Sequence, residues 1–216
     1  AGVLGGLMLW ISPEGLMLIG GVYVWLGLRW LWGHASSMRF LSILASTIAI
    51  MAAIAVMIER PVAAWMTPIY DSISVVYVWV LTLCAIASWG LRAVRTNSTA
   101  KRMGLTTIAG AGIAAVLWKT YPLFFRGPMA EVDPYILSDF LPRVYEAQSV
   151  LSNPAPYALA MLILPLLAVC LCALALRRND TIMNKDIARG TGFFVLLLLC
   201  FVLAQVRWYY YLYPMS

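Results

Sequence analysis

The chain has 216 residues, of which 63% are hydrophobic and only 11% are charged, and its mean hydropathy is +0.87. Ordinary soluble domains carry about 25% charged residues, so this composition excludes a water-soluble globule. The apolar runs are unbroken and as long as membrane helices, without the alternation typical of barrel strands. The sequence therefore predicts an all-α, polytopic transmembrane helix bundle, in which each helix satisfies its own backbone groups within the bilayer.

Seven apolar runs follow one another and predict about seven spanning segments. In chain order they cover residues 1–11, 15–32, 38–58, 73–91, 103–118, 157–176 and 190–206. The first run is too short to span, and another apolar segment begins after residue 208, so we expect the chain to be part of a longer protein. The predicted organisation is transmembrane helices over 1–118, an external loop over 119–156 and transmembrane helices over 157–216.

Two helix starts are predicted from capping patterns. Ser12-Pro13-Glu14 places an N-cap serine, a proline at the first helical position and an acid in the first turn. Asp133-Pro134 repeats that pattern in the long loop. Each pattern predicts a helix that begins at the cap.

Small residues inside the apolar runs indicate packing. The pairs Gly2/Gly6 and Gly110/Gly112 predict close approach of neighbouring helices. The four cysteines lie in apolar runs, without metal-site spacing or a nearby histidine, and are interpreted as small core or lipid-facing residues. They are Cys84, Cys170, Cys172 and Cys200.

The connectors alternate in charge. Loops 29–39, 92–102 and 177–189 carry ten of the fifteen Lys and Arg residues but only two of the nine acids. The other connectors carry five basic and seven acidic residues. The positive-inside rule predicts that the three basic loops are cytoplasmic. The net charge of +6 is therefore a topology signal and does not indicate nucleic-acid binding.

The stretch 119–156 is longer than an ordinary connector, and loops of this length are usually functional or disordered. It is rich in aromatic and aliphatic residues. Ile136, Phe140 and Val144 repeat at helical spacing, although Pro142 interrupts them, which predicts a short amphipathic or re-entrant helix on the external surface. Its polar residues also have simpler interpretations: Asp133 as a helix N-cap, and Glu146 as a surface carboxylate.

Two motifs give this region a family resemblance. Val144-Tyr145-Glu146-Ala147-Gln148 resembles the V-x-E-x-Q core of the SVSEHQP-type motif on an external loop of the catalytic subunit of oligosaccharyltransferase. The stretch from Arg207 to Pro214, RWYYYLYP, resembles the Arg-aromatic-x-x-Tyr-x-x-Pro stretch that opens a later helix of that subunit. In both proteins two crossings separate the motifs. The resemblance covers about residues 119–216.

A third stretch, Gly127-Pro128 followed by Val132-Asp133-Pro134, is similar to bacterial multispanning membrane glycosyltransferases of the same GT-C superfamily. The chain also departs from the oligosaccharyltransferase pattern, because Ala147 replaces the histidine and Ser149 the proline of the loop motif. The family's acidic first and second external loops would precede residue 1. Its soluble C-terminal domain would follow residue 216, so the acceptor stays open.

The resemblance implies transfer of a sugar from a polyprenyl-phosphate or polyprenyl-pyrophosphate donor on the extracytoplasmic face. It implies Glu146 as the catalytic carboxylate, and Arg207 with Tyr211 as donor-phosphate ligands. Asp133, Glu131 and Gln148 are supporting candidates. A divalent cation, Mg²⁺ or Mn²⁺, is the expected cofactor, with its remaining ligands outside this segment.

The expected location is a membrane, the bacterial inner membrane, and the expected partners are the lipid bilayer, a lipid-linked sugar donor and other membrane proteins. Arg207 is also open to interpretation as an interfacial anchor. Two other functions stay open. One is a non-catalytic membrane subunit of a larger assembly. The other is a transporter or flippase, which the lack of ionisable residues within the predicted spans disfavours.

Overall fold

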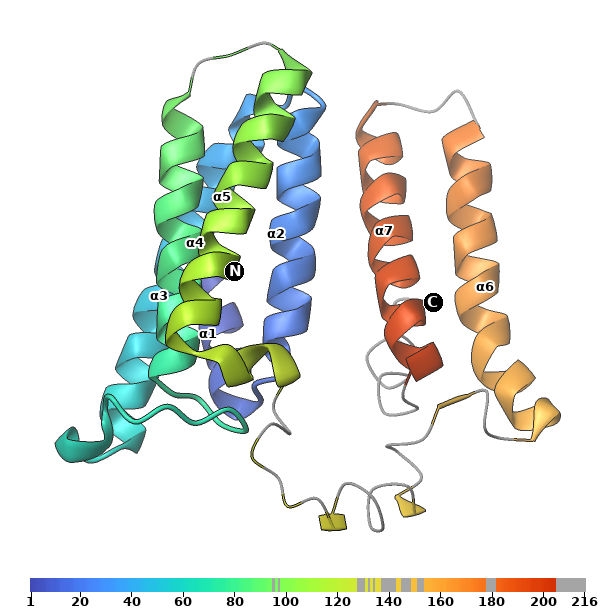
Figure 1. Cartoon of the computed structure of the whole chain (residues 1–216). Helices are drawn as coiled ribbons and strands as arrows, with labels where there is room; N and C mark the ends of the chain where they lie inside the picture. Colours follow the sequence, from blue (N-terminus) through green and yellow to red (C-terminus); the bar gives the residue numbers. More distant parts are fainter. Residues whose placement is uncertain are drawn as a thin grey trace. The chain divides into compact units, whose positions relative to one another are not determined.

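A computed structural model of the chain describes residues 1–94, 96, 98–127, 131, 133, 135–136, 143–144, 149–150, 154–177 and 182–204. These residues form α-helices and short 3₁₀ helices and contain no β-strand, which confirms the predicted all-α class. The helices are α1 (Gly2–Ile11), α2 (Gly15–Leu31), α3 (Ala35–Glu59), η1 (Val62–Ala64), α4 (Val75–Ala93), α5 (Thr99–Thr120), η2 (Pro122–Arg126), α6 (Ala155–Arg177) and α7 (Ile182–Ala204) (Figure 1).

Five helices in the described part of the chain are long and apolar enough to cross a membrane. These spans are Ala35–Glu59, Val75–Ala93, Thr99–Thr120, Pro156–Leu174 and Lys185–Leu203. The remaining two α-helices are shorter, with 10 residues in α1 and 17 in α2. At 1.5 Å per residue, α1 is only about 15 Å long and α2 about 25 Å, against a hydrocarbon core of about 30 Å. The count of seven spans therefore stays a prediction.

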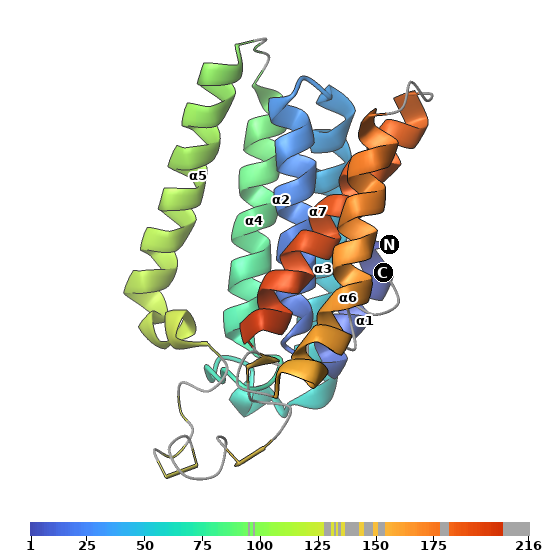
Figure 2. The ribbon, with the colours of Figure 1, turned by 90° about the vertical axis from the view of Figure 1, so that its right-hand side faces the viewer.

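The chain divides into two compact units, residues Ala1–Glu131 and Val132–Ser216. In the first unit, α3 is the central helix, because it packs against α1, α2 and α4 (Figures 1 and 2). Its buried face includes Ile48 and Ala52, and the face of α4 that meets it includes Val76 and Leu81. The fifth helix, α5, lies beside α4 and buries only Arg102 and Leu117.

Glycines let α1 approach α3 closely. A Cβ atom at Gly2 would lie 2.6 Å from the Thr47 Cβ, and one at Gly6 would lie 2.3 Å from the Met51 Cβ. Both distances are too short for real carbon atoms, so the predicted close approach at the Gly2/Gly6 pair is confirmed. The same prediction for Gly110 and Gly112 is wrong within the described residues, because a Cβ atom added at either glycine would have no neighbour within 4 Å. No described residue packs against α5 on the side of these two glycines.

Serine caps begin two of the spanning helices. The Ser74 hydroxyl accepts a hydrogen bond from the Val76 N–H at 3.3 Å, and the Ser98 hydroxyl accepts one from the Lys101 N–H at 3.4 Å. The predicted cap at Ser12 is present, because the Ser12 hydroxyl accepts a hydrogen bond from the Glu14 N–H at 3.3 Å. The α-helix itself does not begin there, since α2 starts at Gly15 with no acid in its first turn. Residues 12–14 instead form a tight turn, whose carbonyl groups accept hydrogen bonds from N–H groups three residues ahead at 3.0 Å.

In the second unit, α6 and α7 pack against each other. Val195, Leu198 and Val202 of α7 are fully buried, as is Val150 in the segment before α6. A Cβ atom at Gly192 would make ordinary contact with the Cys172 Cβ at 3.5 Å, so this glycine is not required by space alone. All four cysteines are free thiols, and Cys170 and Cys200 are exposed on their helices.

Candidate functional site

The four residues to which the resemblance gives the main roles, Glu146, Gln148, Arg207 and Tyr211, lie outside the described residues. The chain on either side of them is described. The Ser149 hydroxyl donates a hydrogen bond of 2.6 Å to the carbonyl oxygen of Leu203. This contact joins Ser149, the last position of the loop motif, to the last turn of α7, just before the arginine motif.

Asp133 and Glu131, the two supporting acids, are both described and exposed. The Asp133 Oδ1 accepts a hydrogen bond from the Tyr135 N–H at 2.8 Å, and its carbonyl oxygen accepts one from the Ile136 N–H at 2.9 Å. This is the capping arrangement that the Asp-Pro pattern predicts. The helix predicted beyond it lies mostly outside the described residues and stays a prediction.

The connector between α3 and α4 is held by Arg60. Its Nε donates to the Ile73 carbonyl at 3.0 Å and its Nη2 to the Ser72 hydroxyl at 2.8 Å. Its own carbonyl accepts a hydrogen bond from the Trp65 indole at 2.9 Å. The Tyr77 hydroxyl also donates to the Tyr70 carbonyl. This connector is therefore held in one conformation by side-chain hydrogen bonds at both its ends.

Glu131 affects the ionisation of a tyrosine in this connector. Burial raises the pKa of the Tyr70 phenol above its usual value, and the nearby Glu131 carboxylate and Tyr121 phenol raise this pKa further. Tyr70 is only 5% exposed. The Glu131 carboxylate therefore lies near a buried tyrosine of the first unit. Its role as a supporting catalytic residue stays a prediction.

The opposite end of the first unit holds a polar cavity of about 360 Å³, which the sequence analysis missed. Arg92 and Arg102 line it, together with Trp30, Ala35, Met38, Val94 and Thr96. Arg102 is 7% exposed, and its guanidinium lies 5.2 Å from the centre of the Trp30 ring. Its Nη1 donates to the Trp30 carbonyl at 2.7 Å and its Nε to the Thr96 carbonyl at 2.9 Å.

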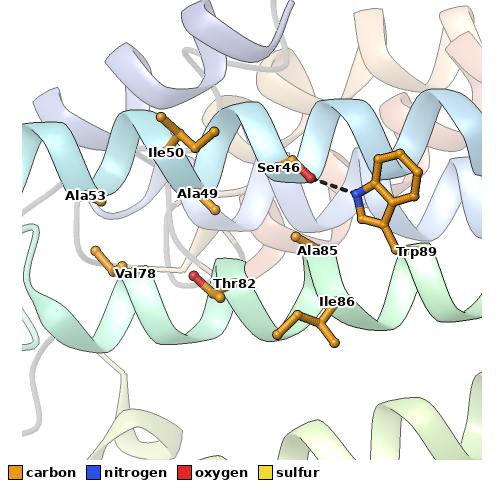
Figure 3. A pocket seen from close by; sticks show the side chains of 9 residues that line it. All are labelled: Ser46, Ala49, Ile50, Ala53, Val78, Thr82, Ala85, Ile86 and Trp89. Atoms are coloured by element: carbon orange, nitrogen blue, oxygen red, sulfur yellow. Dashed lines mark hydrogen bonds between the residues drawn. The ribbon is translucent and has the colours of Figure 1, made fainter.

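A second, apolar groove of about 470 Å³ lies along α3 and α4. Its small side chains leave a channel that Ile50 and Ile86 flank and Trp89 closes at one end (Figure 3). The Trp89 indole donates a hydrogen bond of 3.0 Å to the Ser46 hydroxyl, which fixes the ring across the two helices. The groove is lined by Ser46, Ala49, Ile50, Ala53, Val78, Thr82, Ala85, Ile86 and Trp89.

The described residues do not form a metal centre. No group of three or more His, Cys, Asp or Glu side chains lies close enough together among them to hold an ion. Asp133 already uses a carboxylate oxygen to cap a turn. The expected Mg²⁺ or Mn²⁺ would therefore need ligands beyond the part of the chain that the structure describes.

Comparison with known proteins gives no family. No protein-family model, no curated protein and no solved structure matches this chain. The features that bear on function are therefore the two motifs around Glu146 and Arg207 and the geometry of the described residues beside them.

Proposed function

We propose that this chain is the membrane part of a glycosyltransferase that moves a sugar from a polyprenyl-phosphate or polyprenyl-pyrophosphate donor to an acceptor on the extracytoplasmic face. What supports the proposal is the hydrogen bond between Ser149 and Leu203. Ser149 follows Glu146 by three residues and Leu203 precedes Arg207 by four. At about 3.6 Å per residue, the backbone of Glu146 lies at most about 11 Å from Ser149, and that of Arg207 at most about 14 Å from Leu203.

The order of the helices supports the same proposal. Two helices, α6 and α7, separate the motifs along the chain, and each is apolar and long enough to cross a membrane. An even number of crossings returns the chain to its starting side, so Glu146 and Arg207 would share one face of the bilayer. By the positive-inside rule this face is external, because loop 177–189 between the two helices is basic.

Each residue would have a distinct part in the reaction. The bond between the sugar's anomeric carbon and the phosphate oxygen breaks, and the acceptor's nucleophilic atom forms a new bond to that carbon. Arg207 would bind the phosphate as its negative charge develops, because a planar guanidinium matches phosphate oxygens, and Tyr211 would donate a hydrogen bond to it. Glu146 would orient the acceptor and take its proton. A bound divalent cation would supply further charge neutralisation.

The test uses the full-length protein in membranes, supplied with a polyprenyl-phosphate-linked radiolabelled sugar and, separately, a pyrophosphate-linked one. We expect Glu146→Gln and Arg207→Ala each to lower release of label from the lipid by at least about a hundredfold, as for loss of groups that stabilise a transition state. Arg126→Ala is the matched control, because Arg126 is an exposed cation of the same external loop. Unchanged release in both site variants would remove the assignment.

We also propose that the protein resides in the bacterial inner membrane, with loops 29–39, 92–102 and 177–189 in the cytoplasm. After replacement of the native cysteines, single cysteines at Trp32 and Met66 report the two sides, because both side chains are exposed, by 57% and 79%. A membrane-impermeant maleimide added to spheroplasts should label the cysteine at position 66 and not the one at 32. The reverse pattern would reject this orientation.

A further inference from the structure

The polar cavity at the basic end of the first unit contains a buried positive charge without a carboxylate partner among the described residues. The Arg102 side chain is 7% exposed, and those residues supply acceptors for two of its hydrogen bonds, both backbone carbonyl oxygens. A guanidinium carries five N–H donors. Arg92 brings a second charge to the cavity wall. A buried charge is costly unless it is paired, so this cavity is electrostatically incomplete.

No acid of the first unit can neutralise this end. Loops 29–39 and 92–102, which close it, carry six Lys and Arg residues and no Asp or Glu. The four acids of this unit lie at or beyond the opposite ends of its helices. They are Glu14, Glu59, Asp71 and Glu131.

Two helix N-termini add to the positive potential, that of α3 without a side-chain cap and that of α5 with one N–H capped by Ser98. Ala35, the first residue of α3, lines the cavity, and no side chain caps that helix. Thr96 lines it just ahead of α5, which begins at Thr99. A helix N-terminus carries about half a positive charge and unpaired N–H groups, which favour an anion. The carbonyl end of α2 offsets part of this potential through its bond with Arg102.

The apolar groove continues from this cavity along one stripe of α4. Val78, Thr82, Ala85 and Trp89 line the groove, and Arg92, one turn beyond Trp89, lines the cavity. The Arg92 guanidinium lies 4.6 Å from the centre of the Trp89 ring, so the two sites meet at this pair. From position 92 to position 78 the helix rises about 21 Å, more than the roughly 15 Å of hydrocarbon in one leaflet.

We propose that the cavity and the groove together bind one anionic phospholipid, with its phosphate at Arg102 and Arg92 and an acyl chain along α3 and α4. The ligand's two parts match the two surfaces, because a phosphate pairs with guanidinium groups and an acyl chain is buried by apolar side chains. Arg92 lies in the last turn of α4, at the end of a spanning helix, where headgroups are found. The site is independent of the proposed reaction, which concerns the opposite ends of the helices.

The test is a titration of the full chain in a neutral detergent with a short-chain anionic phospholipid and with a zwitterionic one of the same chains. Bound lipid is counted by native mass spectrometry. We expect the anionic lipid to bind preferentially, and Arg102→Gln and Arg92→Gln each to weaken it by about tenfold, as for loss of a charge-assisted hydrogen bond. Ala53→Leu, which fills the groove, should weaken both lipids. Arg92 is exposed, so its variant remains informative should Arg102→Gln fail to fold.

Two matched controls separate the site from general charge and size effects. Lys101→Gln removes an exposed cation from the same loop, and Ala114→Leu adds the same side chain to an exposed position of α5. Neither should change binding appreciably. Equal weakening by Lys101→Gln would overturn the site in favour of diffuse charge attraction. The last measurement titrates inorganic phosphate alone. The lipid assignment is wrong if phosphate binds as well as the anionic lipid does and Ala53→Leu leaves lipid binding unchanged.

Discussion

The Ser149 hydroxyl and the Leu203 carbonyl oxygen are 2.6 Å apart, a hydrogen bond between residues 54 positions apart in the chain. Ser149 precedes α6 and Leu203 lies in the last turn of α7, so this bond closes the α6–α7 hairpin at the end where its chain enters and leaves. Val150, the next residue, is fully buried beside it. The two motifs that carry the functional proposal therefore extend from a fixed junction.

Removing the Ser149 hydroxyl tests whether this hydrogen bond contributes to stability and to activity. We expect Ser149→Ala to lower the free energy of unfolding by about 1 kcal/mol, because the Leu203 carbonyl loses its donor. Transfer from the lipid-linked donor should fall several-fold, since catalytic geometry is sensitive to small displacements. Unfolding in mixed micelles and label release measure the two effects. Thr120→Ala is the control, because the Thr120 hydroxyl bonds only within its own helix, to Val116. Equal effects of the two substitutions would contradict a special role for the junction.

The contact of α1 with α3 gives a prediction for stability. Gly6→Ala should lower the free energy of unfolding by about 1–3 kcal/mol, because the added methyl group would overlap the Met51 side chain and force the helices apart. Gly110→Ala adds the same group where nothing described lies within 4 Å, and alanine favours a helix over glycine, so it should be neutral or slightly stabilising. Unfolding in mixed micelles compares the two. A Gly6→Ala protein as stable as the parent would contradict the packing.

The buried phenol of Tyr70 predicts a dependence of stability on pH. An unfolded tyrosine ionises near pH 10, whereas burial, Glu131 and Tyr121 raise the pKa of Tyr70 in the fold. Above pH 10 the unfolded chain loses this proton while the folded chain keeps it, so stability falls as pH rises; below pH 10 the contribution is constant. Tyr70→Phe should make this fall shallower between about pH 9 and 11.

The matched control for that titration is Tyr157→Phe, because Tyr157 is 64% exposed. It should retain the parent's full decline in unfolding free energy. A decline of the same slope in Tyr70→Phe and in the parent would show that Tyr70 ionises alike in the folded and unfolded chains.

Hydropathy predicts every α-helix of the described residues but not every helix end. The run predicted over 190–206 corresponds to α7, which begins eight residues earlier at Ile182. Its added turns carry Lys185, Asp186 and Arg189, and an ion pair of 3.6 Å joins the last two. Hydropathy marks the part of a helix that fits in lipid, whereas helical hydrogen bonding continues through polar residues as long as the backbone permits.

The basic cavity could not have been predicted from the sequence in the same way. The charge of loops 29–39 and 92–102 is visible in the sequence, but by itself it predicts only the topology. Burial of Arg102 depends on a carbonyl group at Trp30, 72 positions away, and on the wall that α3 and α4 provide. The one available signal was the complete absence of acids from both loops, together with Trp89 and Arg92 one helical turn apart.

Only Arg102 and Leu117, near its two ends, are buried on α5, and a Cβ atom added at Gly104, Gly110 or Gly112 between them would meet no described atom of another element within 4 Å. The middle of this helix therefore packs loosely against its own unit, so its order depends more on the surrounding lipid or detergent than the order of α3 does. During purification, exchange of native lipid for detergent should destabilise this part of the helix first. Backbone amides in the centre of α5 should then exchange hydrogen sooner than those of the enclosed α3, which makes the choice of detergent an experimental variable.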